Sequence, residues 1–361
     1  MQLKELSAQQ KLACPACGGE AQWNPAKQAL VCAYCGTESP YTLKADGEVV
    51  EHDLVTALKA VPQSARGWQD DRRPVRCQHC QAISLFSGAQ QGKACDFCGS
   101  TALVPFEETG DIIRPETLLP FAVDELSARE RVRKWYGSRW WAPNNLNQKA
   151  LTDTLHGVYL PYWTFDAQVS ARYTAEAGTY LKSRNENQNS RSENEVRWRP
   201  VSGHIDHFFD DTLVCASRGV HPQLVRAVEP FPTTAERLKP YDPGYLSGWT
   251  VERYQLDLVA AAQQGRQRML DAVRQMCSNA IQVDTQRNLQ VDAQFDEQTF
   301  KHVLLPVWLV GYRYGARDFQ VVINGATGQV AGEYPKSWVK IGFAVLAAAL
   351  VGLAMLWLEG R

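Results

Sequence analysis

Eight of the ten cysteines fall in four Cys-x-x-Cys pairs, which is the spacing of metal ligands rather than of disulfide bridges. Fourteen residues separate the first pair from the second and the third pair from the fourth, and the arrangement repeats at an offset of 63 positions. Two tight turns that each present two thiolates complete a tetrahedral Zn²⁺ site with no open position. The sequence therefore predicts two structural zinc ions in two zinc ribbons, held by Cys14, Cys17, Cys32 and Cys35 and by Cys77, Cys80, Cys95 and Cys98.

The residue after the second cysteine of each pair supports this prediction. Gly18, Gly36 and Gly99 occupy three of these positions, where a positive φ lets the turn close and aims backbone N–H groups at sulfur. Gln81 occupies the fourth. Because each segment has few apolar residues, zinc binding at about 10–16 kcal/mol is expected to supply its folding free energy. A redox Cys-x-x-Cys or an iron site with the same sulfurs remains an alternative.

The charge balance disfavours a polyanionic partner. The 361 residues include 38 basic and 39 acidic side chains, a formal charge of -1, and two zinc ions with four thiolates each would move it to about -5. Nucleic-acid binding would need a local basic patch. The basic residues near the two quartets are diluted by Asp70, Asp71 and Asp96; they are Lys4, Lys11, Lys27, Lys44, Arg72, Arg73, Arg76 and Lys93.

The last part of the chain is apolar. The run from Ile341 to Leu358 has no charged residue, and as a helix it would span about 27 Å. Trp338 and Trp357 flank it as interfacial aromatic residues do. We therefore expect a single-pass tail anchor at 338–358; a buried core helix is the alternative. The start of the chain has no apolar signal-peptide core, so we expect the N-terminal bulk in the cytoplasm with reduced thiols.

The middle of the chain, 107–337, predicts an α+β domain with antiparallel strands and an internal duplication. Val158 and Val303 each open the motif V-x-L-P-x-W, followed by alternating apolar and polar residues. We expect a basic helix from a capping box of Ser127 and Glu130. We also expect a helix interrupted at Gly265, and a hairpin turn in which Asn324 and Gly325 have positive φ. The expected units are 1–46, zinc ribbon 1; 47–73, helix and linker; 74–106, zinc ribbon 2; 107–337, the α+β domain; and 338–358, the transmembrane helix.

Motifs for catalysis are weak. The segment HIDHFFDD offers His204, His207, Asp210 and Asp211 to a metal, but on a strand positions 204 and 207 point to opposite faces. GAQQGKA, at 88–94, lacks the spacing and the Ser or Thr of a phosphate-binding loop. We therefore predict no enzyme, with a metal-dependent enzyme at the HIDH segment as an alternative.

The paired ribbons, together with ARGW, LLPFAVDELSARERVRKW, YLPYWTFDA and the terminal apolar run, resemble the bacterial TFIIB-type zinc-ribbon membrane proteins. Proteins of this family are often labelled as similar to the primosomal replication helicase, yet this chain has no helicase motor. The resemblance implies PspA-type and SPFH-type neighbours, a location in the bacterial inner (cytoplasmic) membrane, and recruitment of an SPFH partner to that membrane.

These observations lead to a function hypothesis. We expect a non-enzymatic, tail-anchored adaptor whose two cytosolic zinc ribbons bind protein partners, because a second metal-held module adds a contact at high effective concentration. A homo-oligomer is compatible with it. The alternative is a membrane-tethered nucleic-acid-binding protein.

Overall fold

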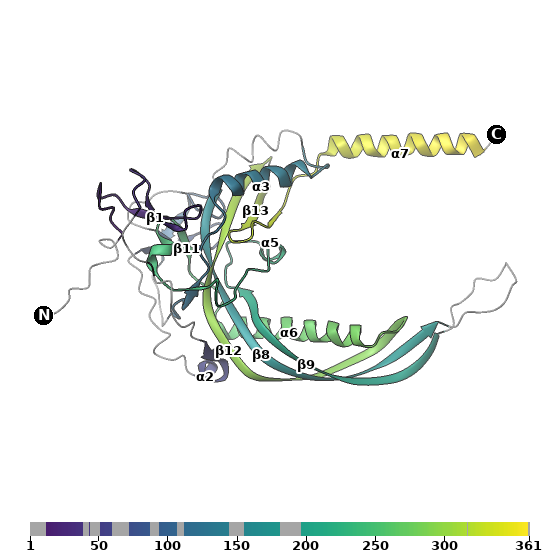
Figure 1. Cartoon of the computed structure of the whole chain (residues 1–361). Helices are drawn as coiled ribbons and strands as arrows, with labels where there is room; N and C mark the ends of the chain where they lie inside the picture. Colours follow the sequence, from purple (N-terminus) through teal and green to yellow (C-terminus); the bar gives the residue numbers. More distant parts are fainter. Residues whose placement is uncertain are drawn as a thin grey trace.

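The computed structural model describes residues 12–38, 43, 51–59, 72–86, 94–106, 112–143, 155–180, 196–315 and 317–359. Its centre is a mixed sheet of 12 strands. Two long strands, β8 (Leu155–Tyr180) and β12 (Thr285–Tyr314), pair antiparallel over most of their length, and β9 (Val196–Cys215) pairs with the other edge of β8. Figure 1 shows these three strands bending together into a curved ribbon, with α6 (Leu258–Ala280) along its inner side.

The burial pattern explains how the long strands are covered. From Val158 to Ala167 every residue of β8 is buried, because both faces of the sheet are covered there. Farther along, buried and more accessible residues alternate, since α6 covers one face. Asp257 caps α6 by accepting a hydrogen bond from the Ala260 N–H at 2.8 Å.

The two V-x-L-P-x-W motifs lie side by side. Leu160 of β8 is directly opposite Leu305 of β12, and these two residues have the same place in their motifs. Each motif also pairs in parallel with a short strand: β11 (Thr250–Glu252) lies beside the β8 motif and β7 (Thr117–Leu118) beside the β12 motif. The two halves are therefore related by a local two-fold repeat.

The repeat extends to the helices that follow the short strands. β7 leads to α3 (Glu125–Gly137), capped by Asp124, and β11 leads to α6, capped by Asp257. In both halves the motif tryptophan donates its indole N–H to the residue before the cap: Trp308 to the Val123 carbonyl and Trp163 to the Leu256 carbonyl, each at 2.9 Å. Equivalent residues thus make equivalent contacts.

The predicted fold class is wrong. The sheet is mixed rather than antiparallel because β7 and β11 pair in parallel with β12 and β8. The strands of the second ribbon, β4 (Arg73–Cys77), β5 (Ile83–Phe86) and β6 (Leu103–Pro105), also extend this sheet, since β5 pairs with β11. These partners come from distant parts of the chain, so the alternation within one strand does not reveal them.

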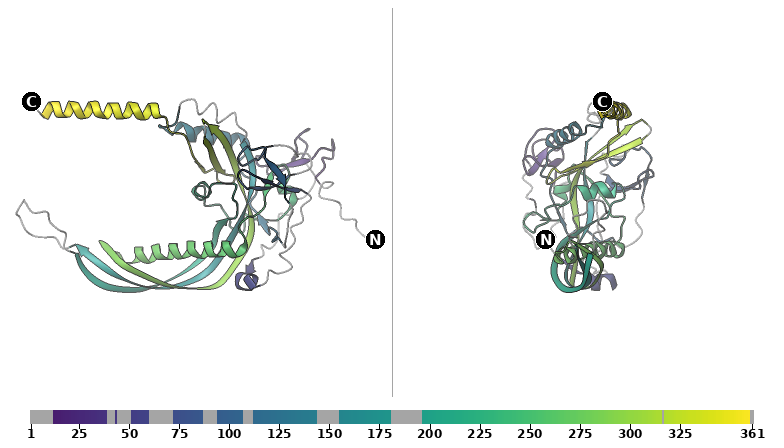
Figure 2. Two further views of the ribbon diagram at one scale, coloured as in Figure 1. Left: turned by 180° about the vertical axis from the view of Figure 1, so that it is seen from behind. Right: turned by 90° about the vertical axis from the view of Figure 1, so that its right-hand side faces the viewer.

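The predicted transmembrane helix at 338–358 is wrong as well, and with it the single-pass location in an inner membrane. This segment forms α7 (Trp338–Glu359), which extends away from the sheet in the left view of Figure 2. A helix must cover a hydrocarbon core of about 30 Å with apolar residues to span it. Within the described part of the chain, no helix has the combined length and apolarity to do so.

Three local predictions also change. α3 begins at Glu125 rather than at a Ser127 cap, because the Asp124 carboxylate accepts from both the N–H and the hydroxyl of Ser127. α6 runs through Gly265 without a break: an added Cβ there would lie 2.6 Å from the Phe165 ring, so the glycine allows close packing.

In the turn after β13 (Arg317–Asn324), positive φ occurs at Gly328 and not at Asn324 or Gly325. The Asn324 side chain instead accepts hydrogen bonds from the N–H groups of Ala326 and Thr327.

The remaining elements are short. α2 (Leu54–Lys59), within the predicted helix and linker at 47–73, buries Leu54 and Ala57, while Leu58 is exposed. Residues 60–71 of the predicted helix and linker, and all of the GAQQGKA segment except Ala94, lie outside the described residues. The other elements are β1 (Ala21–Asn24), β2 (Ala29–Cys32), β3 (His52–Asp53), β10 (Lys239–Pro240), β14 (Val330–Gly332), α5 (Pro222–Ala227) and the 3₁₀ helix η3 (Pro243–Leu246).

Candidate metal centres

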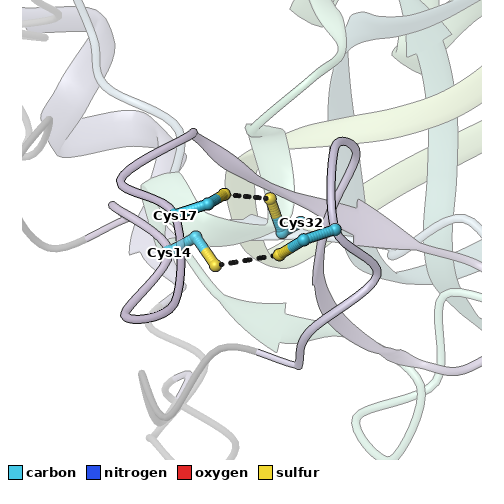
Figure 3. Close-up of side chains that lie close together, drawn as sticks. Cys14, Cys17 and Cys32 are labelled. Atoms are coloured by element: carbon cyan, nitrogen blue, oxygen red, sulfur yellow. Dashed lines mark hydrogen bonds between the residues drawn. The ribbon is translucent and has the colours of Figure 1, made fainter.

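The first four predicted ligands come together. Cys14 and Cys17 lie on a turn before β1, Cys32 ends β2, and Cys35 lies on the turn that follows. The Cys14 and Cys35 sulfurs are 3.5 Å apart, as are those of Cys17 and Cys32, and the four sulfurs lie within 4.8 Å of one another. Figure 3 shows the sulfurs of the labelled cysteines pointing toward one another from two chain segments.

The second quartet has the same geometry. Cys77 and Cys98 have their sulfurs 3.6 Å apart, as do Cys80 and Cys95. A disulfide would require about 2.05 Å, whereas four sulfurs at about 2.3 Å from a tetrahedral Zn²⁺ ion lie about 3.8 Å apart. Each of the two quartets could therefore hold one zinc ion.

The turns explain why the sulfurs converge. The predicted positive φ is confirmed at Gly18, Gly36 and Gly99, with values of 74°, 73° and 72°. Gln81 adopts the same conformation, with φ of 65°, and its side-chain amide donates to the Gln78 carbonyl at 2.8 Å. The left-handed residue closes each turn on the first cysteine of its pair. At one of the four turns, the chain therefore tolerates the backbone strain of a positive φ at a residue other than glycine.

Hydrogen bonds and mutual repulsion shape the thiol chemistry. The Thr37 hydroxyl lies 3.2 Å from the Cys35 sulfur and lowers the pKa of Cys35 to about 6. The hydrogen bond with Cys80 lowers the pKa of Cys95 to about 6, and the same hydrogen bond raises the pKa of Cys80. Burial raises the pKa of Cys98 to about 12. One thiolate thus opposes ionisation of the next, which a divalent cation among the sulfurs would relieve.

Both ribbons are anchored to the rest of the fold. In the first ribbon, the Trp23 indole N–H donates to the Phe121 carbonyl at 3.2 Å, and the Ser247 hydroxyl donates to the Ala21 carbonyl at 2.7 Å. In the second ribbon, Phe97 is 1% exposed, in one hydrophobic cluster with Cys77, Cys95 and strand residues of β12 and β13. The two cysteine quartets therefore lie on segments that are part of the main core.

The two histidines of the HIDH segment do not join Asp210 and Asp211 in one metal site. His204 pairs with Asp206 at 2.9 Å, and the His207 ring contacts Phe209. Asp210 and Asp211 instead form a group with Asp166, whose carboxylate oxygens lie within 4.8 Å of one another and could hold a metal ion. The adjoining cation is the buried ammonium of Lys301, which is 2.7 Å from Asp211 and 2.9 Å from Glu51, so the acidic groups are compensated within the chain. Burial raises the pKa of Asp166 to about 6.

A cavity of about 750 Å³ lies between the two ribbons and the start of α3. Sequence reasoning missed it because its walls come from segments far apart in the chain. Its polar side chains include Asp96 from the second ribbon, Asp124 and Glu125 from α3, and His156 from β8; Trp249 and Trp308 are among its aromatic side chains. One sequence signal for the cavity residue Asp124 comes from comparing the two halves of the repeat. Asp124 follows Thr117 by the same number of residues as Asp257 follows Thr250.

Comparisons with known proteins give limited information. The chain is 26% identical over 267 residues to the "Uncharacterized protein YdjG" of Bacillus subtilis (strain 168), an alignment that covers 67% of this chain and 72% of that protein. No protein family and no solved structure matches the chain.

Proposed function

We propose that the protein is a zinc-stabilised scaffold that binds protein partners, with two structural Zn²⁺ ions and no catalytic role for either metal. The observation that carries the proposal is the closure of both quartets. Four sulfurs surround each centre, so a tetrahedral ion there has no open position for water or substrate. The bound ion would neutralise thiolates and fix the turns.

The surface of the first ribbon suits a contact role. Tyr34, on the turn between Cys32 and Cys35, is 83% exposed. Tyrosine is enriched in protein interfaces because it combines a large apolar ring with a hydroxyl group. An SPFH-type protein is the partner that the resemblance to the zinc-ribbon family implies. A nucleic-acid role has less support, because the chain has a formal charge of -1 before any thiolate is counted.

Site-specific photo-crosslinking tests this function. A photo-crosslinking amino acid at position 34 in the zinc-loaded full chain should give discrete crosslinked products with another protein in cells. The matched control carries it at Asp271 of α6, whose side chain is 62% exposed, and should not give these products. Equal products at both positions, or none at position 34, would count against partner binding by the ribbon. Retention on DNA at low salt would favour the nucleic-acid alternative.

A further inference from the structure

The two cysteine quartets differ in how far their cysteines are exposed to solvent. In both quartets the first cysteine of each Cys-x-x-Cys pair is buried. The second cysteine of each pair is exposed in the first quartet, at Cys17 and Cys35, and half-buried in the second, at Cys80 and Cys98. Because the reactivity of a thiolate follows its exposure, a reagent in solution reaches the first quartet more readily.

The large sheet covers the second quartet. Cys80 and Cys98 pack against the hydrophobic cluster that contains Phe97 and buried residues of β12. Gly311 of β12 lies so close that an added Cβ would be 3.9 Å from the Cys98 Cα. The Gln320 side-chain amide of β13 donates to the Phe97 carbonyl at 3.2 Å. Two strands of the sheet therefore hold the second quartet in place and shield it.

The first ribbon is anchored through residues other than its cysteines. Ala21, Trp23 and Leu30 of β1 and β2 belong to a hydrophobic cluster shared with the rest of the fold. None of the four cysteines of the first quartet belongs to a hydrophobic cluster of the described residues. β1 and β2 also form a sheet of their own. The sulfurs of the first quartet can therefore change partners without breaking the 12-stranded sheet.

Each exposed cysteine of the first quartet has a buried cysteine next to it. The Cys35 sulfur lies 3.5 Å from that of Cys14, and the Cys17 sulfur lies 3.5 Å from that of Cys32 (Figure 3). Both pairs connect the two turns of the quartet. A disulfide needs about 2.05 Å, so each pair has to close by about 1.5 Å to form one. An oxidised sulfur in this quartet thus has a second sulfur at hand.

We propose that the first quartet is an oxidation site, at which hydrogen peroxide converts the thiolates into disulfides while the second quartet stays intact. The exposed Cys35 thiolate attacks a peroxide oxygen, the O–O bond breaks, and Cys35 becomes a sulfenic acid as one water molecule leaves. The Cys14 thiolate then attacks the Cys35 sulfur, the S–O bond breaks, and a second water molecule leaves. The two thiolates lose two electrons, the peroxide gains them, and solvent supplies two protons. A quartet that has lost two thiolates no longer holds its ion tightly.

Oxidation would also change the surface that the proposed scaffold function uses. Tyr34 lies between Cys32 and Cys35 in the sequence, and a carbon of its ring is 2.6 Å from the position of an added Cβ at Gly19, beside the other turn. The position of Tyr34 therefore depends on the two turns being held together. The inference goes beyond the scaffold function and rests on one part of it, the zinc-loaded first ribbon.

The test treats the zinc-loaded full chain with hydrogen peroxide and follows zinc release with a chromogenic chelator, after subtraction of the release without peroxide. We expect one of the two ions to leave at least about ten-fold faster than the other. Mass spectrometry of the fast phase should find the disulfides Cys14–Cys35 and Cys17–Cys32. Release of both ions at one rate, retention of both, or faster oxidation of the second quartet would overturn the proposal.

Two variants assign the fast phase to the first quartet. Cys35→Ser leaves only the second quartet complete, so its tightly bound ion should be released slowly, and fast release would contradict the assignment. Cys215→Ser, outside both quartets, is the matched control and should keep the fast phase; its loss would place the reactive thiol at Cys215 instead.

Hydrogen exchange and metal content complete the test. The oxidised chain should lose protection in β1 and β2 and keep it in β4, β5 and β6, and the opposite pattern would contradict the proposal. A chain purified with fewer than two zinc ions would refute the zinc-stabilised scaffold and this inference together. A chain with two ions that both resist peroxide would refute this inference alone and leave the scaffold function standing.

Discussion

Removing one ligand from each quartet should have unequal consequences. Cys35 and Cys98 are the fourth cysteines of their quartets, so Cys35→Ser and Cys98→Ser form a matched pair. We expect each variant to bind one zinc ion tightly instead of two. The loss of stability should differ between the two variants because the two ribbons support different parts of the fold. β1 and β2 form a separate two-stranded sheet, whereas β4, β5 and β6 belong to the 12-stranded sheet.

The expected magnitude follows from the side chains that the second ribbon buries. Leu85, Phe86 and Phe97 are 0%, 4% and 1% exposed. Burial of such a side chain contributes about 1.5–3 kcal/mol, or about 5–9 kcal/mol for the three. That is comparable with the whole stability of a typical domain. We therefore expect Cys98→Ser to lower Tm by at least about 10 °C, with β11 losing its partner β5.

Hydrogen exchange with metal analysis distinguishes the two variants. Cys98→Ser should lose protection in β4, β5 and β11. Cys35→Ser should lose protection in β1 and β2 while the β8–β12 ladder stays protected. If Cys98→Ser lost one zinc ion and kept the protection of β5 and β11, the reasoning that the second centre supports the sheet would be refuted.

Three further predictions concern the core. Burial lowers the pKa of His302 to about 4, so the contribution of its neutral form to stability is complete above pH 6.5, and about 3 kcal/mol of the free energy of unfolding should be lost as pH falls from 6.5 to 4. Urea unfolding of His302→Gln should show a smaller loss over this range, and a pH dependence identical to that of the original chain would contradict the assignment. Lys301→Met should lower the free energy of unfolding by about 3–5 kcal/mol, because Asp211 loses its buried cation. The exposed control Arg274→Met should lower it by at most about 1 kcal/mol, and similar losses in the two variants would argue against the buried pair. Gly265→Ala should destabilise the fold by about 1–3 kcal/mol, because the added methyl group would contact the Phe165 ring. Gly342→Ala in α7 is the control, and it should not destabilise the fold because no atom lies near its added methyl group. A Gly265→Ala variant that is more stable than the original chain would show that Phe165 moves freely.

The sequence predicted the two cysteine quartets well because ligand spacing is a local property. Cys-x-x-Cys fixes two sulfurs within one turn, and Gly18 reports the left-handed backbone that the turn needs. The repeated V-x-L-P-x-W motif likewise identified two related strands. The parallel pairing of β7 with β12 was not predictable in this way, because Thr117 and Val303 are distant in the chain.

The cavity was beyond sequence reasoning for the same reason. Asp96, Glu125 and Trp308 come from a ribbon, a helix and a strand, and none of them has a distinctive local pattern. The apolar run at the end of the chain predicted a helix, which is present as α7, but hydropathy over 338–358 overstated what the helix could span.

X-ray absorption at the zinc edge, combined with metal analysis of the purified full chain, tests the central claim most directly. We expect two zinc ions per chain, each surrounded by four sulfur atoms at about 2.3 Å. Fewer than two ions, or oxygen ligands in place of sulfur, would mean an absent or open centre and would contradict a scaffold held by two closed zinc sites.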